Sequence, residues 1–429
     1  MPIQLLYFTK YKGADMRKTC LFMLIVLISL IAVSCASTGA TAEAQVIEEK
    51  AQVAQQPAEK GVSTVDNADA LAMPEILMED TSALSLFKAY EDKGIEIGTC
   101  LLPREMNDGW VMEKLKTQFS SICPFEGFKS AQLLDKEQSI KNGRLTVVFD
   151  NATKSAMQWA RDNGKKIHGH TLIWFKSNPE WMFRENFQDD APYVTRDVML
   201  QRLEDYIRGV FEGIEANGWT DLIYAFDIIN EYYNTDGSAP NDGPWIQIIG
   251  DDVIWHAFNF SRKYAPKSIR LIYNESFCEI STSKRDAAVA LLKSLVDENG
   301  NYLVDGIGLQ CRLALRNNID SVCSNIEYIA QNIDGLELQL TEIDCTISTK
   351  AQVLAANLKK QGTYIYRVME KVLQLIEDGY KVTTVQISGC RDDLDPLVAV
   401  SGAPSIYDVR GNEKYSYFGL LQMKEYAGF

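Results

Sequence analysis

Short β-rich runs alternate with longer amphipathic segments from residue 94 onward, and this alternation constrains the fold more than any other feature. Most of the runs are continuously apolar, as expected of parallel strands that are buried on both faces. The expected strands are 95–102, 120–124, 166–174, 222–230, 269–274, 306–313, 336–344 and 382–388. The expected helices include 152–163, 196–216, 251–264, 284–297, 320–332 and 352–377. Such regular alternation predicts an α/β fold, a (β/α)8 TIM barrel.

An open doubly wound sheet is the rival arrangement for alternating strands and helices. That fold usually carries a Gly-rich phosphate loop after its first strand, whereas residues 98–101 read GTCL. The barrel is therefore favoured, and its active site is expected at the C-terminal ends of the strands. Polar and aromatic side chains stand at those ends: Glu126, Lys129, His170, Trp174, Asn230, Glu231, Asn274, Glu275, Gln310, Arg312, Glu342, Asp344 and Ser388. This mixture suits a sugar pocket, because hydroxyls need hydrogen-bond partners and sugar faces pack on aromatic rings.

Two of the expected strands end in a glutamate, Glu231 in 226–231 (FDIINE) and Glu342 in 340–344 (LTEID). Hydrolysis of an acetal by double displacement needs one carboxylic acid to protonate the leaving oxygen. It also needs an ionised carboxylate to attack the anomeric carbon. A single glutamate at a strand end is more often a salt-bridge partner. Strands four and seven face each other across a barrel mouth, however, so these two can form such a catalytic pair.

These motifs resemble those of glycoside hydrolase family 10, the xylanase family of the large retaining barrel clan, over about residues 85–429. The similar segments are 169–174 (GHTLIW) with 179–181 (PEW), 226–231 (FDIINE), 272–275 (IYNE), 304–310 (VDGIGLQ), 340–344 (LTEID) and 404–408 (PSIYD). The resemblance implies a retaining glycoside hydrolase that cleaves internal β-1,4 linkages of xylan or a related β-glycan.

The resemblance also implies a role for individual residues. Glu231 would be the acid/base and Glu342 the nucleophile. Asn230 would hydrogen-bond the 2-hydroxyl of the sugar at the cleavage point. The remaining implied residues are His170 and Trp174 in the same subsite, Lys129 and Glu126 in sugar binding, and Gln310, Asp344, Asn274 and Arg312 around the nucleophile.

Several positions depart from the family pattern. The strand-two motif Glu-Asn-x-x-Lys reads FEGFK at 125–129, so Lys129 is in place but Glu126 stands where asparagine is expected. Phe175 and Arg312 each replace a usual histidine, and 385–393 (VQISGCRDD) lacks the usual tryptophans. An arginine beside Glu342 would hold that carboxylate ionised. These changes predict a shifted substrate preference, such as a decorated xylan or another β-glycan, or a weak enzyme.

Two other functions remain open at this point. The first is a surface lipoprotein that binds glycans on the same barrel without cutting them, which the losses around strands two and eight favour. The second is a different barrel glycosidase, such as an endoglucanase or mannanase. Retention of Asn230, Glu231 and Glu342 favours catalysis.

The N-terminus departs from globular sequence. Residues 16–18 (MRK) are basic, 21–33 are almost wholly apolar, and a small residue precedes Cys35. This pattern predicts a secretory leader at 1–35 with lipid attachment at Cys35, the alternative being a plain signal peptide with an incidental cysteine. Residues 36–80 are expected to be a flexible linker and 81–429 the catalytic domain. The protein is therefore expected to be exported and lipid-anchored at the outer membrane or cell surface, and otherwise secreted.

Charge and cysteine spacing exclude other classes of function. The net charge of −15 and the absence of a basic stripe argue against a nucleic-acid partner. The seven cysteines beyond the leader show no C-x-x-C or Cys/His spacing and are expected to be buried free thiols. Neither a metal nor an organic cofactor is implied. The expected partners are a polysaccharide or oligosaccharide and, through the anchor, a membrane.

Overall fold

The computed structural model of the chain describes residues 80–347, 353–394 and 402–429, which all fall within one compact unit. The expected leader (1–35) and nearly all of the expected linker (36–80) lie outside the described residues. Their boundaries, and lipid attachment at Cys35, therefore stay predictions. Within the described part of the chain, no helix is both long and apolar enough to cross a membrane.

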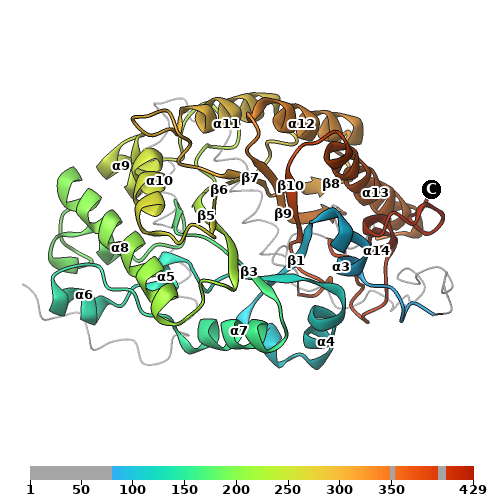
Figure 1. Cartoon of the computed structure of the whole chain (residues 1–429), viewed down its shortest axis with the longest axis horizontal. Helices are drawn as coiled ribbons and strands as arrows, with labels where there is room; N and C mark the ends of the chain where they lie inside the picture. The colour runs from blue at the N-terminus through green and yellow to red at the C-terminus, as the bar shows by residue number, and fades with distance from the viewer. Residues whose placement is uncertain (1–79, 348–352, 395–401) are drawn as a thin grey trace, which may run out of the picture. The chain divides into compact units, whose positions relative to one another are not determined.

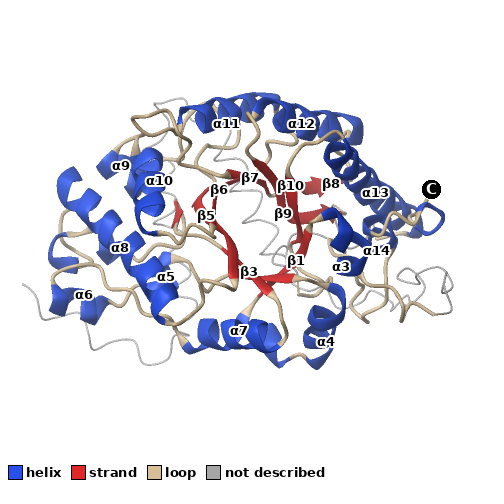
Figure 2. Ribbon diagram, in the orientation of Figure 1, coloured by secondary structure: helices blue, strands red, loops and turns tan. Residues whose placement is uncertain are grey.

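Parallel strands form a closed ring with helices outside it, as Figure 1 and Figure 2 show. In order around the ring, each strand pairs with the next in parallel register, and β10 pairs with both β1 and β9 to close it. The ring consists of β1 (Glu96–Leu101), β2 (Ser121–Pro124), β3 (Lys166–Gly169), β5 (Ile223–Asn230), β6 (Arg270–Glu275), β7 (Gly306–Leu309), β9 (Glu337–Thr346) and β10 (Val382–Ile387). The prediction of a (β/α)8 barrel is thereby confirmed.

Two expected strands are each interrupted where they reach the mouth of the barrel. The run 166–174 divides into β3 and β4 (Ile173–Trp174), which pairs with β5. Between them Thr171 Oγ1 and the Leu172 N–H both donate to the Asp227 carbonyl, at 3.0 and 3.1 Å. The run 306–313 divides into β7 and β8 (Arg312–Ala314), because Cys311 has a φ of 55° that no strand accommodates. Both breaks redirect side chains into the mouth.

The helices that surround the barrel largely follow the expected periodicity. They are α3 (Leu86–Tyr90), α4 (Gly109–Gln118), α5 (Ser130–Leu133), α6 (Lys136–Asn142), α7 (Asn151–Asp162), α8 (Arg196–Ala216), α9 (Pro244–Ile249), α10 (Val253–Tyr264), α11 (Thr282–Ser294), α12 (Ile319–Asn332), α13 (Ala355–Glu377) and α14 (Tyr415–Leu420). Short 3-10 turns are η1 (Glu91–Lys93), η2 (Pro103–Asn107), η3 (Glu180–Phe183), η4 (Glu185–Phe187) and η6 (Lys424–Tyr426). The expected helix 284–297 ends earlier, at Ser294, because Val296 pairs with Tyr302 in an antiparallel bridge.

Helix α7 shows how the local sequence produces these elements. The Asp150 carboxylate accepts from the Thr153 N–H at 2.7 Å and caps the first turn. Ala156, Met157 and Ala160 recur at helical spacing and are buried against the barrel. Burial of such an apolar face, at roughly 25 cal/mol per Å², is what fixes the helix there.

The C-terminal segment closes the structure by packing α14 against α13. A Cβ added to Gly362 of α13 would lie 2.4 Å from Tyr415 Cβ and 2.4 Å from the Ala427 carbonyl oxygen. Only glycine allows this approach, so a substitution at Gly362 would displace α14. The core is formed by the residues between the ring and the helices, and the seven cysteines from Cys100 to Cys390 are buried and free, as expected.

Candidate active site

A cavity of about 370 Å³ opens at the C-terminal ends of the strands, where the barrel class places its active sites. Residues from four expected strand ends line it. They are His170, Trp174, Asn230, Glu231, Gln310, Arg312 and Glu342. The structure therefore brings the two expected catalytic glutamates into one cavity, together with most of the residues expected to bind sugar.

Glu231 follows β5 in an unusual backbone conformation. Its φ is 52°, in the left-handed region that residues with a Cβ seldom occupy. Two hydrogen bonds hold this conformation. The Glu231 N–H donates to the Asn274 carbonyl at 2.9 Å, and Asn241 Nδ2 donates to the Glu231 carbonyl at 2.6 Å. Strained backbone of this kind is often found at functional sites, because the surrounding structure must stabilise it.

The Glu231 carboxylate accepts hydrogen bonds from two neutral donors. Trp174 Nε1 donates to Oε2 at 2.9 Å and Gln310 Nε2 donates to Oε1 at 3.0 Å. The ammonium of Lys176 lies 4.0 Å from Oε2, and the Glu231 side chain remains 19% exposed. This carboxyl is therefore oriented by an indole and an amide and still faces the cavity.

Glu342, within β9, has a different environment. Its side chain is only 5% exposed and its Oε2 pairs with Arg312 Nη2. Asn274 Nδ2 donates to its Oε1 at 3.2 Å. Gly308 makes room for that amide, since a Cβ at Gly308 would lie 2.5 Å from Asn274 Oδ1. Glu342 is thus fixed by a cation and an amide.

A chain of amides connects the two carboxylates. Asn230 Oδ1 accepts from both Asn274 Nδ2, at 3.0 Å, and Gln310 Nε2, at 3.3 Å. Thr341 Oγ1 donates to Asn274 Oδ1 at 2.6 Å and fixes the orientation of that amide. Gln310 touches both glutamates: its carbonyl accepts from the Glu342 N–H at 3.1 Å, and its side-chain amide contacts Asn230 and Glu231.

Arg312 stands where the family usually has a histidine, and it contacts three side chains. Its Nη1 donates to Asp344 Oδ2 at 2.6 Å and to Ser388 Oγ at 2.8 Å, while Nη2 contacts Glu342. One guanidinium therefore joins β8, β9 and the end of β10. A planar group with several donors can satisfy these partners at once, which a lysine could not do.

Asp227 supports the same wall from inside the barrel. His168 Nε2 and His170 Nδ1 each lie 2.8 Å from its carboxylate oxygens. Burial alone would raise the pKa of Asp227, but the two histidines hold it below its usual value. His170 is also stacked on Phe125, with 5.1 Å between ring centroids. Sequence reasoning missed Asp227 and His168, although a carboxylate within the otherwise apolar run 223–229 was a signal for Asp227.

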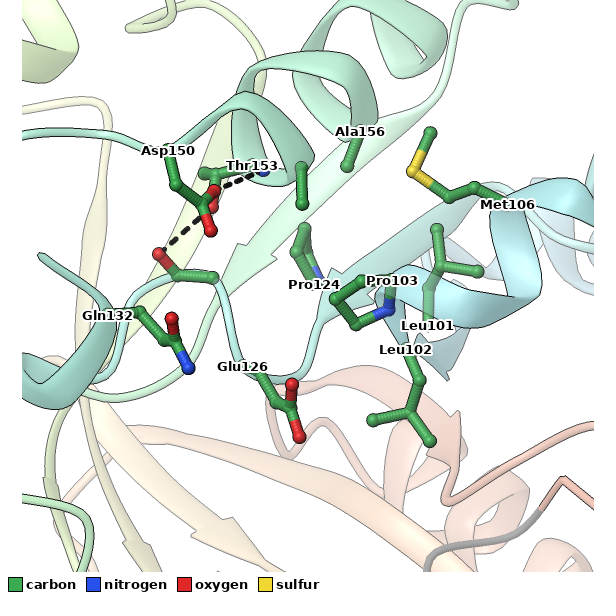
Figure 3. Close-up of a pocket in the computed structure, with 12 residues that line it drawn as sticks. Leu101, Leu102, Pro103, Met106, Pro124, Glu126, Gln132, Asp150, Thr153 and Ala156 are labelled. Carbon is green, nitrogen blue, oxygen red and sulfur yellow. Dashed lines mark hydrogen bonds between the residues drawn. The ribbon is translucent and has the colours of Figure 1, made fainter.

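Lys129 and Glu126, the two sugar-binding residues expected after strand two, lie in different pockets. Lys129 is buried with its ammonium 4.0 Å from the Phe125 ring centroid and 5.4 Å from that of Trp174. Burial lowers the pKa of Lys129, and the nearby Glu342 carboxylate opposes that effect. Glu126 is exposed and lines a second pocket with Leu102, Pro124 and Gln132, which Figure 3 shows. The structure therefore brings Lys129, but not Glu126, toward the two glutamates that are expected to be catalytic.

Glu275 also stands at a strand end, but the structure uses it differently. Its carboxylate pairs with Lys284 Nζ at 2.8 Å, and both side chains are almost fully buried. Burial raises the pKa of Glu275, and Lys284 counteracts this shift. The pair fixes α11 against β6 at the wall of the cavity, which Lys284 lines. Among the described residues, no group of three or more His, Cys, Asp or Glu side chains is arranged to hold a metal ion.

Comparison with known proteins places this geometry among glycoside hydrolases. The family model described as glycosyl hydrolase family 10 matches residues 85–423. A putative endo-1,4-β-xylanase of Caldicellulosiruptor saccharolyticus is 31% identical over 307 residues, covering 68% of this chain and 96% of that protein. Endo-1,4-β-xylanase Y of Acetivibrio thermocellus is 30% identical over 341 residues, but these cover 75% of this chain and only 30% of that longer protein.

Solved structures agree with the family match. The Clostridium thermocellum endo-1,4-β-D-xylanase 10B, in a complex with xylohexaose, superposes with a TM-score of 0.71 at 27% identity. The superposition covers 79% of this chain and 67% of that one. This chain is therefore similar, over residues 85–423, to proteins named as endo-1,4-β-xylanases, and it has the same barrel fold as one of them.

Proposed function

The chain belongs to glycosyl hydrolase family 10, and on that premise we propose that it is a retaining endo-β-1,4-xylanase or a hydrolase of a closely related β-glycan. The observation that carries the proposal is the placement of Glu231 and Glu342 in one cavity, linked by the amides of Asn230, Asn274 and Gln310. The relatives named as endo-1,4-β-xylanases support the substrate class.

In the first step, the Glu342 carboxylate would attack the anomeric carbon while the Glu231 carboxyl donates its proton to the glycosidic oxygen. The bond to the leaving sugar breaks as the covalent glycosyl–enzyme ester forms. Arg312 and Asn274 hold the attacking carboxylate in place. Trp174 and Gln310 orient the carboxyl of Glu231, so each group is positioned before substrate binds.

In the second step, Glu231, now ionised, would accept a proton from water as that water attacks the same anomeric carbon. The ester bond to Glu342 breaks, the anomeric configuration is retained, and Glu231 returns to its protonated form. The 19% exposure of the Glu231 side chain, against 5% for Glu342, suits a residue that must exchange protons with incoming water.

The experiment that tests the proposal is reducing-sugar release from glucuronoxylan, arabinoxylan, β-glucan and mannan, with Glu342→Ala as the control. Release from a xylan that disappears in the variant is expected. Release from β-glucan or mannan alone would support a hydrolase but contradict xylan as its substrate. Glycan binding without release from any polymer would favour the capture lipoprotein, which the comparisons do not favour.

We further propose that the protein is exported and lipid-anchored through Cys35, at the outer membrane or cell surface. The basic residues at 16–18, the apolar run 21–33 and the small residue before Cys35 support this proposal. Incorporation of labelled fatty acid into the wild type but not into Cys35→Ala is the expected result. A variant that stays membrane-bound would contradict anchoring at this residue.

A further inference from the structure

Two histidines, one in β3 and one directly after it, contact the same carboxylate inside the barrel. His168 Nε2 lies 2.8 Å from Asp227 Oδ1, and His170 Nδ1 lies 2.8 Å from Asp227 Oδ2. The two histidines occupy alternate positions of an extended segment, so both side chains point to the same face of the ring. Each carboxylate oxygen of Asp227 is therefore occupied by one of the two imidazoles.

Only one of these histidines reaches the cavity. His170 lines it together with Glu231 and Glu342, and among the described residues its Nε2 has no hydrogen-bond partner. His168 is fully buried in the barrel interior and does not line the cavity. Any effect of His168 on a bound sugar must therefore pass through Asp227 and His170.

The interior end of this chain of hydrogen bonds indicates which nitrogen of His168 carries the proton. His168 Nδ1 lies 3.3 Å from the Tyr224 hydroxyl, which itself accepts from Thr384 Oγ1 at 3.3 Å. Burial raises the pKa of Tyr224, so the phenol keeps its proton. That proton is left to point at His168 Nδ1, which is then the unprotonated nitrogen. The proton of His168 is consequently on Nε2, from which it is donated to Asp227 Oδ1.

This direction of donation determines what Asp227 can do for His170. A neutral His168 orients the carboxylate but does not cancel its charge, so the negative charge of Asp227 acts on His170 alone. The second carboxylate oxygen then accepts the Nδ1–H of His170 and fixes both the tautomer and the orientation of that ring. Nε2 of His170 is the nitrogen that remains for a ligand in the cavity.

We propose that His168 is a positioning residue for substrate binding: through Asp227 it holds the ring of His170 with Nε2 available to a sugar hydroxyl in the cavity. This inference rests on the proposed function and adds to it a residue that lies outside the cavity. The Tyr224 hydroxyl completes the chain by fixing the tautomer of His168.

The kinetic experiment is a double-mutant cycle between His168 and His170. His168→Met removes both ring nitrogens, and kcat/KM on xylan should fall about tenfold, as the loss of one oriented hydrogen bond would produce. In a His170→Ala background the same substitution should change kcat/KM by less than about twofold, because the group that His168 positions is gone. His168→Gln, whose amide can still donate to Asp227, should restore most of the activity. His256→Gln is the matched control, since this histidine also faces a carboxylate, that of Asp252 at 3.3 Å, but lies in α10 and outside the cavity.

Two kinetic results would overturn the inference. A loss of similar size in both backgrounds would show that His168 acts on the fold and not through His170. A loss below about twofold from His168→Met in the otherwise unchanged enzyme would show that His170 needs no such support.

NMR of the wild type covers the case in which His168→Met does not fold. The chain contains only three histidines, so the imidazole nitrogens of isotope-labelled histidine can be assigned individually. His168 should be the neutral Nε2–H tautomer at pH 7, and Tyr224→Phe should shift its Nδ1 signal. An Nδ1–H tautomer or an imidazolium at His168 would overturn the inference.

Failure of the wild type to hydrolyse any of the polymers would refute the proposed function separately. Calorimetric binding of xylotetraose to Glu342→Gln, with and without His168→Met, then decides the inference. Weaker binding with His168→Met is expected, and equal affinities would reject the inference.

Discussion

The two walls of the cavity hold their glutamates by different means. On the β5 wall, Glu231 has a left-handed backbone, two neutral hydrogen-bond donors and a side chain that is 19% exposed. On the β9 wall, Glu342 lies within a strand, at a shift in the pairing of β9 with β10, is paired with Arg312 and is only 5% exposed. The same side-chain type is therefore placed once beside solvent and once beside a guanidinium.

This difference matches the two tasks that double displacement assigns to carboxyl groups. The attacking carboxylate must be ionised when substrate arrives, and an ion pair with Arg312 suits that state. The acid/base must gain and lose a proton in every turnover, so neutral donors and access to water suit it better. Environment, and not residue type, thus separates the proposed nucleophile from the proposed acid/base, and each of the following variants tests that separation.

The largest effect is expected from Glu342→Ala. Without the attacking carboxylate the glycosyl–enzyme ester cannot form, so kcat should fall by at least about four orders of magnitude on every substrate. Steady-state hydrolysis of xylan and of an aryl xyloside measures this loss. If the variant retained a substantial part of the wild-type turnover on either substrate, Glu342 would not be the attacking carboxylate.

A smaller and substrate-dependent loss is expected from Glu231→Ala. Protonation of the leaving oxygen contributes about 10²–10⁴-fold for a poor leaving group such as a sugar, and little for an activated nitrophenolate. The kcat/KM on xylan should therefore fall much further than the rate of the first step on an activated aryl xyloside, followed as a burst of nitrophenolate. Equal losses on the two substrates would show that the two glutamates do not divide the tasks in this way.

Much of the fold could be predicted from the sequence, because the elements of a barrel repeat. The run of apolar residues in β9 and the helical spacing of Met199, Leu203 and Tyr206 in α8 are local signals. The interruptions at 170–172 and 310–311 could not be predicted in this way. They depend on contacts between distant residues, such as Thr171 with the Asp227 carbonyl, and on the positive φ of Cys311.

The candidate site was predictable to a similar degree. The sequence motifs identified the glutamates and the amides around them, since each follows a strand. The partner of each side chain depends on how the strands align: the motif placed Gln310 near Glu342, which its carbonyl contacts, but not the contact of its side-chain amide with Glu231. Glu126 and Lys129 both follow closely after β2, but the turn between them directs the two side chains into different pockets. No local pattern contains that information.

Arg312→Met sharpens the comparison on the β9 wall alone. Loss of the guanidinium leaves Glu342 and Asp344 without their cation, and a charge-assisted hydrogen bond contributes about 1.5–3 kcal/mol. The kcat on xylan should fall about 10- to 100-fold. Arg410→Met, on an exposed turn, is the matched control and should behave as the wild type. A loss below twofold would mean that the Glu342 wall does not depend on its ion pair.

The smallest effect concerns a third carboxyl, Glu279, in the loop between β6 and α11. Like Glu342 it is buried, but neither of its oxygens has a hydrogen-bond partner among the described residues. The charged groups that act on it are Lys284, Glu275 and Arg312, and burial raises the pKa of Glu279 to about 7. Glu279 therefore shows that the pKa of a buried carboxyl rises when it has no ion pair such as that of Glu342 with Arg312.

The sign of the stability effect follows from this shift. A carboxyl whose pKa is raised on folding favours the folded state below its unfolded pKa, and this contribution is lost as the pH rises through about 7. Glu279→Gln cannot ionise, so it should be more stable than the wild type by about 2–3 kcal/mol at pH 8 and by less than about 1 kcal/mol at pH 5. Thermal unfolding at the two pH values measures the difference, with the exposed Glu298→Gln as control. A gain that is the same at both pH values would show that Glu279 is ionised in the folded protein throughout, and that burial without a cation does not separate it from Glu342.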